Sequence, residues 1–215
     1  MPRLAQVSRA EAPPEVLEMY QRLFGDRDPV SQPGTATGTP GNWWTVFAQS
    51  PDVFASAVGQ FGLFNSRKRH LDPVLRELAI TRTGFAAGSQ FVYSQHCKAA
   101  RAAGISDTKV AEISSWASSG LFEPRERAVL AYVDEVVLQD GRVQDATFAR
   151  LREQIDEVAI LELTFVTATY KLHATICRAL RLEYDDVPER VVEVPAPGQE
   201  GAAADVMTQI SRESS

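Results

Sequence analysis

The segment from Asp72 to Trp116 constrains the fold most tightly, because its helix boundaries can be read from the sequence. Asp72 followed by Pro73 marks a helix start, since an aspartate accepts hydrogen bonds from the free amides of the first turn and a proline supplies the φ angle that this turn needs. Gly104 ends the next helix, and Ser106 caps the one after it. The segment therefore predicts a pair of helices joined by a tight link.

Helical spacing of apolar residues extends over the rest of the chain as well. No stretch shows sustained two-residue alternation between turn signals, which would indicate strands. The sequence therefore predicts an all-α protein, with one domain over residues 1–184, a long Gly/Pro-rich loop at 25–41 and an acidic Pro/Gly/Ala-rich tail at 185–215. Helices are expected at 14–24, along an apolar stripe that starts near 42 and restarts at 50–51 to run through 64, from 73 to the link at 85–88, and at 89–104, 106–116, 124–138, 146–154 and 156–182. Loops as long as 25–41 are often functional lids.

Charge and cysteine content restrict the partners and the compartment. The net charge of −6 comes entirely from the residues after 182, so the body of the chain is neutral. A neutral body with an acidic tail argues against nucleic acid or an anionic membrane as a partner. The chain has no apolar run of membrane-spanning length and no signal-peptide pattern at its start. Its two cysteines are too few for a disulfide framework, which favours a reducing, cytoplasmic setting.

Glu77 and His96 are the most prominent candidate site residues, one on each helix of the central pair. Two interpretations remain open: a structural ion pair in the core, or an acid–base pair in which Glu77 fixes the imidazole tautomer and His96 moves a proton. One side of the second helix carries this imidazole, two hydroxyl groups and several small side chains. Its members are Ser89, Val92, Tyr93, His96, Ala99, Ala100 and Ala103.

Other candidate sites are weaker. His173 and Cys177 share a helix face, but two ligands do not make a metal site, so no metal is predicted. Trp43 and Trp44 are adjacent, which predicts that one packs inward while the other meets a groove or a neighbouring subunit. The chain has no Gly-rich phosphate loop and no serine nucleophile elbow.

The order of motifs in the central segment resembles the carboxymuconolactone decarboxylase and alkylhydroperoxidase D-like family. The motifs are Leu71-Asp72-Pro73, Arg76-Glu77-Leu78-Ala79-Ile80, His96, Ala99-Ala100, Ala102-Ala103-Gly104-Ile105-Ser106 and the later Glu162-Leu163, Tyr170, Arg178-Ala179-Leu180 and Glu183. This resemblance implies an all-helical alkylhydroperoxidase D-like fold with a central antiparallel helix pair. It also implies a homo-oligomer built on a trimeric ring.

The chain departs from the family pattern where the chemistry of the redox members takes place. Those members carry a Cys-x-x-Cys pair ahead of the histidine, and its two positions fall on Ser89 and Val92 here. Another branch carries an aromatic-Glu-Trp run, which is replaced by Phe91-Val92-Tyr93. The resemblance with these departures indicates a non-redox, cofactor-free lyase or isomerase that transfers a proton at carbon on a small oxidised substrate, such as an unsaturated lactone, enol or keto acid. The alternative is a catalytically silent structural or ligand-binding member.

In the enzymatic interpretation, His96 is the general acid/base, Glu77 orients it, and Tyr93 and Ser89 bind substrate oxygen. Thr81 and Val92 line the expected pocket. The 25–41 loop and one of Trp43 or Trp44 would cover it, and the tail would wrap around a neighbouring subunit.

The missing thiol pair yields a first prediction. Purified protein should show no thiol-dependent reduction of hydroperoxides, because the sulfenic acid and disulfide steps require sulfur at both positions. Cys97 directly follows His96 and so projects about 100° away from it around the helix. A coupled peroxidase assay checks this, and hydroperoxide reduction that disappears in Cys97→Ser would contradict it.

Overall fold

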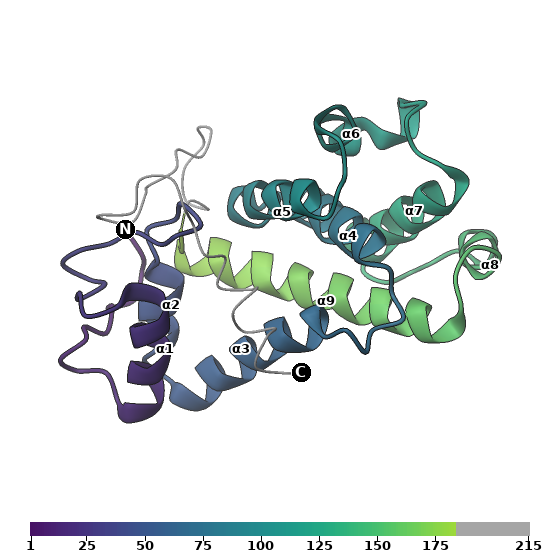
Figure 1. Cartoon of the computed structure of the whole chain (residues 1–215). Coiled ribbons are helices and arrows are strands. Elements are labelled where there is room, and N and C mark those ends of the chain that lie inside the picture. Colours follow the sequence, from purple (N-terminus) through teal and green to yellow (C-terminus); the bar gives the residue numbers. More distant parts are fainter. Residues whose placement is uncertain (184–215) are drawn as a thin grey trace. The chain divides into compact units, whose positions relative to one another are not determined.

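The computed structural model describes residues 1–183, so the predicted acidic tail lies outside the described residues. The all-α prediction is confirmed: residues 1–183 contain α-helices and one 3₁₀ helix but no strand (Figure 1). The elements are α1 (Pro14–Phe24), α2 (Asn42–Phe47), α3 (Pro51–Asn65), α4 (Pro73–Ala86), α5 (Gln90–Ala102), α6 (Asp107–Glu112), the 3₁₀ helix η1 (Ile113–Ser118), α7 (Pro124–Leu138), α8 (Asp145–Arg152) and α9 (Glu157–Leu180). No helix among them is long and apolar enough to cross a membrane.

The chain forms two compact units. The first comprises Met1–Lys68 together with the segment that begins at Cys177, and the second is Arg69–Ile176. The expectation of a single domain over residues 1–184 stays a prediction.

An aromatic cluster forms the centre of the first unit. Trp43 and Trp44 are both buried, with 2% and 8% of their surface exposed, and both contact Phe54 and Phe61 of α3. The prediction that only one of the two tryptophans packs inward is therefore wrong. Neighbouring residues do point in different directions around a helix, but two indole rings are large enough to reach the same pair of phenylalanines.

The long loop of the first unit is held by hydrogen bonds of its own. Thr35 and Thr39 are buried, and their hydroxyl groups lie 2.9 Å apart. The carboxylate of Glu183 accepts hydrogen bonds from the backbone amides of Gly41 and Trp43, at 3.2 and 2.7 Å, and so satisfies free donors at the start of α2. The role of this loop as a lid stays a prediction.

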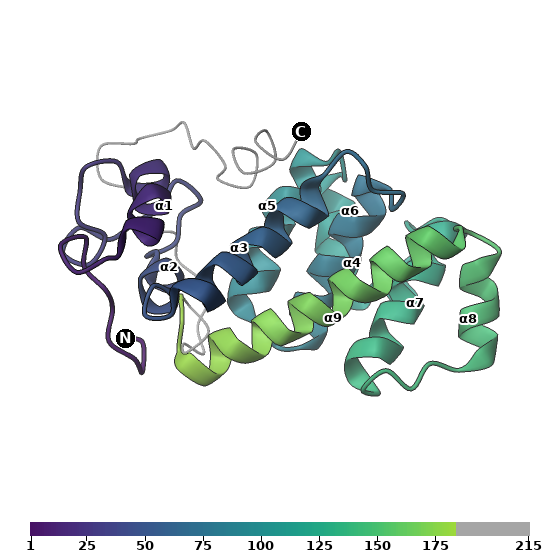
Figure 2. The same ribbon diagram turned by 90° about the horizontal axis from the view of Figure 1, so that it is seen from below.

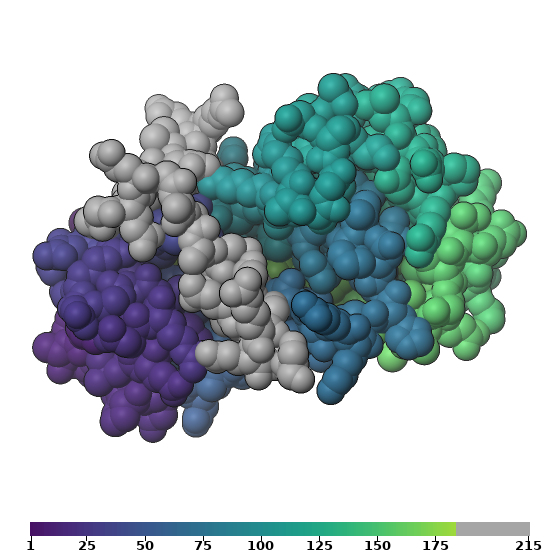
Figure 3. All heavy atoms as spheres, viewed as in Figure 1, coloured from purple at the N-terminus to yellow at the C-terminus, as the bar shows by residue number. Residues whose placement is uncertain are grey.

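The second unit is built on the α4–α5 hairpin. The Asp72 carboxylate accepts hydrogen bonds from the amides of Val74 and Leu75, as its position before Pro73 predicts. Helix α9 runs along this unit and contacts both α5 and α7 (Figures 1 and 2). The stretch from α5 to η1 forms a continuous surface, coloured teal, on the side that Figure 3 displays.

One predicted helix, at 106–116, divides in two. The α-helix ends at Glu112 and the chain continues as the 3₁₀ helix η1. The Arg82 guanidinium donates hydrogen bonds to the carbonyls of Ile113 and Ser114, at 3.2 and 2.7 Å. Because these two carbonyls accept hydrogen bonds from an α4 side chain, they do not depend on the amides of a continuing α-helix.

The two helices of the hairpin cross at very short range. The link between them turns at Gly88, whose φ of 67° suits glycine, and the Ser89 amide donates to the Gly84 carbonyl at 2.9 Å. A Cβ atom on Gly84 would lie 2.6 Å from the backbone nitrogen of Tyr93 and 2.9 Å from a methyl group of Val92. Gly84 is thus required for the close approach of α5 to α4.

This contact predicts that Gly84→Ala destabilises the protein by about 1–3 kcal/mol, because the added methyl group pushes the two helices apart. Urea unfolding followed by circular dichroism measures the change. Gly59→Ala is the matched control: Gly59 lies in α3, and a Cβ atom there meets nothing within 4 Å. That variant should be more stable by about 0.5–1 kcal/mol, and equal effects of the two substitutions would contradict the steric explanation.

Candidate active site

Glu77 and His96 meet where α4 and α5 cross. The Nδ1 atom of His96 lies 2.9 Å from the Oε2 atom of Glu77, so the contact expected from the sequence is present. The side chain of Glu77 is 6% exposed and that of His96 is 15% exposed. The carboxylate is therefore almost fully desolvated, whereas the imidazole retains access to solvent.

Arg76 holds the other oxygen of the same carboxylate. Its Nε atom lies 2.9 Å from Oε1 of Glu77, and its side chain is also mostly buried. Burial by itself would raise the pKa of the Glu77 carboxyl, but the hydrogen bond and charge of His96, followed by those of Arg76, bring this pKa below its usual value. Glu77 is therefore an ionised, doubly held acceptor.

This geometry selects the tautomer of a neutral His96. A carboxylate can only accept, so Nδ1 carries the hydrogen and Nε2 carries the lone pair. No side chain or backbone group within residues 1–183 forms a hydrogen bond with Nε2. The basic nitrogen of the imidazole is thus available to a ligand.

Tyr170 and His173 of α9 complete the aromatic surroundings of His96. The Tyr170 ring meets the imidazole edge to face, with centroids 4.6 Å apart, and Tyr170 also contacts His173 at 5.9 Å. His173 stacks on Phe91 at 5.9 Å. Burial, with a smaller repulsion from His96, lowers the pKa of His173 to about 3, so it stays neutral near neutral pH. The sequence placed Tyr170 on a family-like helix but assigned it no role.

Tyr93 points its hydroxyl group at Cys97, one turn further along α5. Burial raises the pKa of Tyr93 to about 12, which leaves a neutral hydroxyl at physiological pH. Burial also raises the pKa of Cys97, and this opposes thiolate formation. Tyr93 and Cys97 therefore both keep their protons, and the Tyr93 hydroxyl and the Cys97 thiol can donate hydrogen bonds.

Three predicted substrate-binding residues have structural contacts. The Ser89 hydroxyl accepts a hydrogen bond from the Val92 amide at 3.2 Å and so caps α5, and the Val92 side chain is 2% exposed. The Thr81 hydroxyl donates to the Glu77 carbonyl at 2.7 Å. These contacts position the site, and direct binding of substrate by the three residues stays a prediction.

Other polar and aromatic side chains have contacts of their own. Arg82 forms two hydrogen bonds to Asp134, at 2.6 and 3.0 Å, and Trp116 donates to the same carboxylate. Trp43 and Trp44 belong to the first unit, and their role in substrate binding stays a prediction. In the part of the chain that the structure describes, no group of three or more His, Cys, Asp or Glu side chains is arranged to hold a metal ion.

Comparison with known families agrees with the sequence resemblance. Residues 52–135 match the model of the carboxymuconolactone decarboxylase family, so the resemblance is confirmed, and this segment includes both Glu77 and His96. No protein among those with curated descriptions matches the chain.

Several solved structures share the fold. An alkylhydroperoxidase AhpD core protein from Ralstonia eutropha JMP134 superposes with a TM-score of 0.66 at 18% identity, over 86% of this chain and 93% of that one. A debrominase in complex with 2,3,4-tribromopyrrole gives 0.62 at 16% identity, over 98% and 96%. A protein of unknown function from Agrobacterium tumefaciens gives 0.57 at 23% identity, over 68% and 96%. At these identities the likeness establishes the alkylhydroperoxidase D-like fold alone.

The lowered pKa of Glu77 predicts how Glu77→Gln changes stability with pH. The ionised carboxylate stabilises the folded state above the pKa of an unfolded glutamate, about 4.3, and this stabilisation is lost as pH falls through the lower folded-state pKa. At pH 7 we expect Glu77→Gln to be less stable by about 1.5–3 kcal/mol, the value of a hydrogen bond to a charged group.

Urea unfolding of both proteins from pH 7 to pH 3 tests this expectation. The difference between their free energies of unfolding should narrow once the pH drops below about 4.3. A difference that stays constant over this range would show that the ionisation of Glu77 does not contribute to folding.

Proposed function

We propose that this protein is a cofactor-free lyase or isomerase in which His96 moves a proton at a substrate carbon. The match of residues 52–135 to the carboxymuconolactone decarboxylase family supports this proposal. The observation that carries the proposal is the 2.9 Å contact between His96 Nδ1 and Glu77, because it leaves the basic Nε2 atom available beside a carboxylate that stabilises the imidazolium. The substrate class is a small oxidised molecule, such as an unsaturated lactone, an enol or a keto acid.

In the proposed reaction, the Nε2 atom removes a proton from a carbon next to a carbonyl group. The electrons of the broken C–H bond enter the carbonyl system and form an enolate, while Glu77 balances the positive charge on the imidazolium. The imidazolium then returns its proton to another carbon of the enolate, which completes an isomerisation. In a decarboxylation no C–H bond is broken first: the electrons of the bond to the departing carbon dioxide enter the carbonyl system, and His96, protonated from solvent, delivers one proton to the carbon that carried the carboxylate. Electrons and protons balance without an external oxidant or reductant.

A hydrogen-bond donor for the enolate oxygen comes from Tyr93 in this proposal. With its pKa raised to about 12, the hydroxyl stays protonated and can donate to the developing oxyanion. The mostly buried Arg76 serves as a positioning residue, since it binds Glu77 through Oε1 and so keeps Oε2 directed at His96. The edge of Tyr170 restricts the rotation of the imidazole ring.

The proposal predicts that wild-type protein exchanges carbon-bound protons for deuterium, or converts substrate, within a panel of unsaturated lactones and keto acids in D₂O. His96→Gln should lose at least about 100-fold of this rate, the usual contribution of a general acid–base group, while it keeps its circular dichroism spectrum. Proton NMR measures both the exchange and the conversion.

His70→Gln is the matched control, because this histidine is exposed and its Nδ1 atom lies 3.5 Å from the carboxylate of the exposed Asp156. It should keep the wild-type rate. If His96→Gln and His70→Gln were equally active, or if the wild-type protein processed no member of the panel, the silent structural role of the Glu77–His96 pair would replace the catalytic one.

A further inference from the structure

A glutamine next to His96 carries a buried amide group without a hydrogen-bond partner. The Nε2 atom of Gln95 is shielded from solvent, and no acceptor within residues 1–183 forms a hydrogen bond with it. A buried N–H group without an acceptor destabilises the folded state, because the hydrogen bonds to water that it loses on folding are not replaced. Such groups are rare in folded proteins, so the position of Gln95 requires an explanation.

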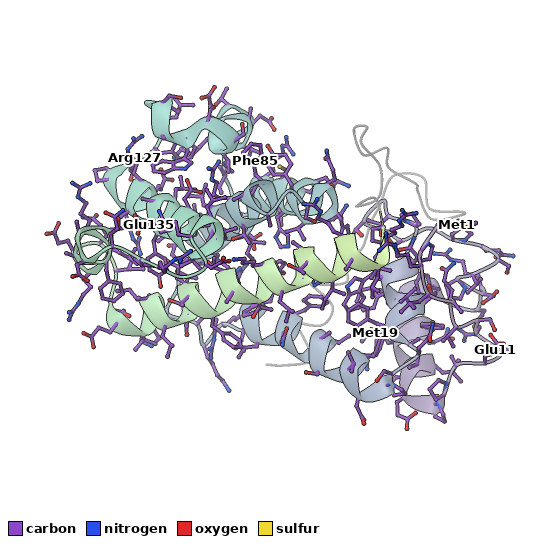
Figure 4. The ribbon with its side chains drawn as sticks, turned by 180° about the vertical axis from the view of Figure 1, so that it is seen from behind. Met1, Glu11, Met19, Phe85, Arg127 and Glu135 are labelled. Atoms are coloured by element: carbon purple, nitrogen blue, oxygen red, sulfur yellow. The ribbon has the colours of Figure 1, made fainter. Side chains whose placement is uncertain are left out.

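The side of α5 that carries Gln95 faces α9. Gln95 lies one turn after Phe91, and residues four apart project from the same side of a helix. Phe91 stacks on His173 of α9. Tyr170 of the same helix contacts the imidazole of His96. Figure 4 shows α9 passing along the hairpin of α4 and α5, with side chains between the helices. The Gln95 amide therefore lies on the side of His96 that meets α9.

Two other buried polar atoms of the same unit are less suited to a ligand. The Thr167 hydroxyl of α9 also lacks a partner, but Thr167 is completely buried. The Nε atom of Arg69 belongs to a guanidinium group that already binds Glu162 through Nη1, at 3.2 Å. Gln95 as a whole residue is half-buried, so a ligand that arrives from solvent can reach this side chain.

The charges around His96 decide which acceptor suits this donor. The ionised Glu77 and the guanidinium of Arg76 balance each other while His96 is neutral. The proposed reaction converts His96 into an imidazolium, which leaves a positive charge in excess among the three side chains. A substrate carboxylate balances this charge, and it accepts a stronger hydrogen bond from an amide than a neutral carbonyl does.

We propose that Gln95 is a substrate-binding residue: its amide donates a hydrogen bond to a carboxylate of the substrate, on the side of His96 that meets α9. Among the small oxidised molecules considered above, this selects a keto acid over an uncharged lactone or ketone. The inference rests on the proposed function, which supplies the imidazolium charge that the carboxylate balances.

Gln95→Met tests whether the amide is kept for a ligand. Methionine has the same chain length and a similar helix propensity but no N–H group, so the melting temperature without ligand should rise by at least about 2 °C. Gln90→Met is the matched control, because Gln90 is an exposed glutamine of the same helix, and it should melt like the wild type. Circular dichroism follows the unfolding. A lower melting temperature of Gln95→Met would show that the amide supports the fold, which overturns the proposal.

Ligand-observed NMR titration measures binding separately from turnover. The probes are levulinate, a keto acid, and methyl propyl ketone, which has the same chain length but no carboxylate. Wild-type protein should bind levulinate at least about 10-fold more tightly than the ketone, the contribution of one hydrogen bond to a charged group. Gln95→Met should lose most of this preference, and Gln90→Met should keep it.

Turnover of levulinate distinguishes this inference from the proposed function. If levulinate binds through Gln95 but exchanges no protons for deuterium in D₂O, the binding role stands and the proton transfer by His96 fails. Equal binding of the two probes by the wild type, or an unchanged preference in Gln95→Met, overturns the binding role even where proton exchange is observed.

Discussion

The close crossing of α4 and α5 at Gly84 is the contact on which the candidate site depends. Because a Cβ atom at this position would come within 2.6 Å of the Tyr93 backbone nitrogen, only glycine allows the helices to approach so far. From this crossing the two helices keep Glu77 and His96 at hydrogen-bond distance, although the residues lie two turns before and one turn after the contact. Packing of backbone against backbone thus fixes an electrostatic pair.

Once the carboxylate is desolvated, its surroundings must compensate the loss of water. Arg76 and His96 each take one oxygen of Glu77, and the outcome is a pKa below the usual glutamate value in spite of burial. The pKa of the nearby His173 is lowered too, but there burial is the main cause, and the lowered pKa favours the neutral imidazole. The two histidines therefore divide their roles: one is paired with a charge and reaches solvent, and the other belongs to an aromatic packing layer.

Local signals in the sequence were sufficient to predict the hairpin and its pair. Asp72, Gly88 and Ser106 act through their own capping or turn chemistry, which depends only on near neighbours. Contacts that depend on side-chain reach were not predictable. Arg76 and Glu77 are adjacent, and adjacent helical residues do not normally face each other, while Tyr170 approaches His96 across 74 positions of chain. The burial of both Trp43 and Trp44 was not predicted for the same reason. The directions of their Cβ atoms around the helix do not fix where two large indole rings end up.

The residues that replace the thiol pair have structural contacts of their own. Ser89 uses its hydroxyl group to cap α5, and Val92 packs its methyl group against Gly84 at the helix crossing. Both positions have therefore become part of the scaffold that holds His96. The thiol of Cys97, one residue beyond His96, binds the Tyr93 hydroxyl, and its raised pKa disfavours the thiolate. The imidazole is held by the Glu77 carboxylate, which accepts its hydrogen bond. In the proposed reaction this carboxylate would stabilise the imidazolium, and the neutral Tyr93 hydroxyl would donate to the oxyanion.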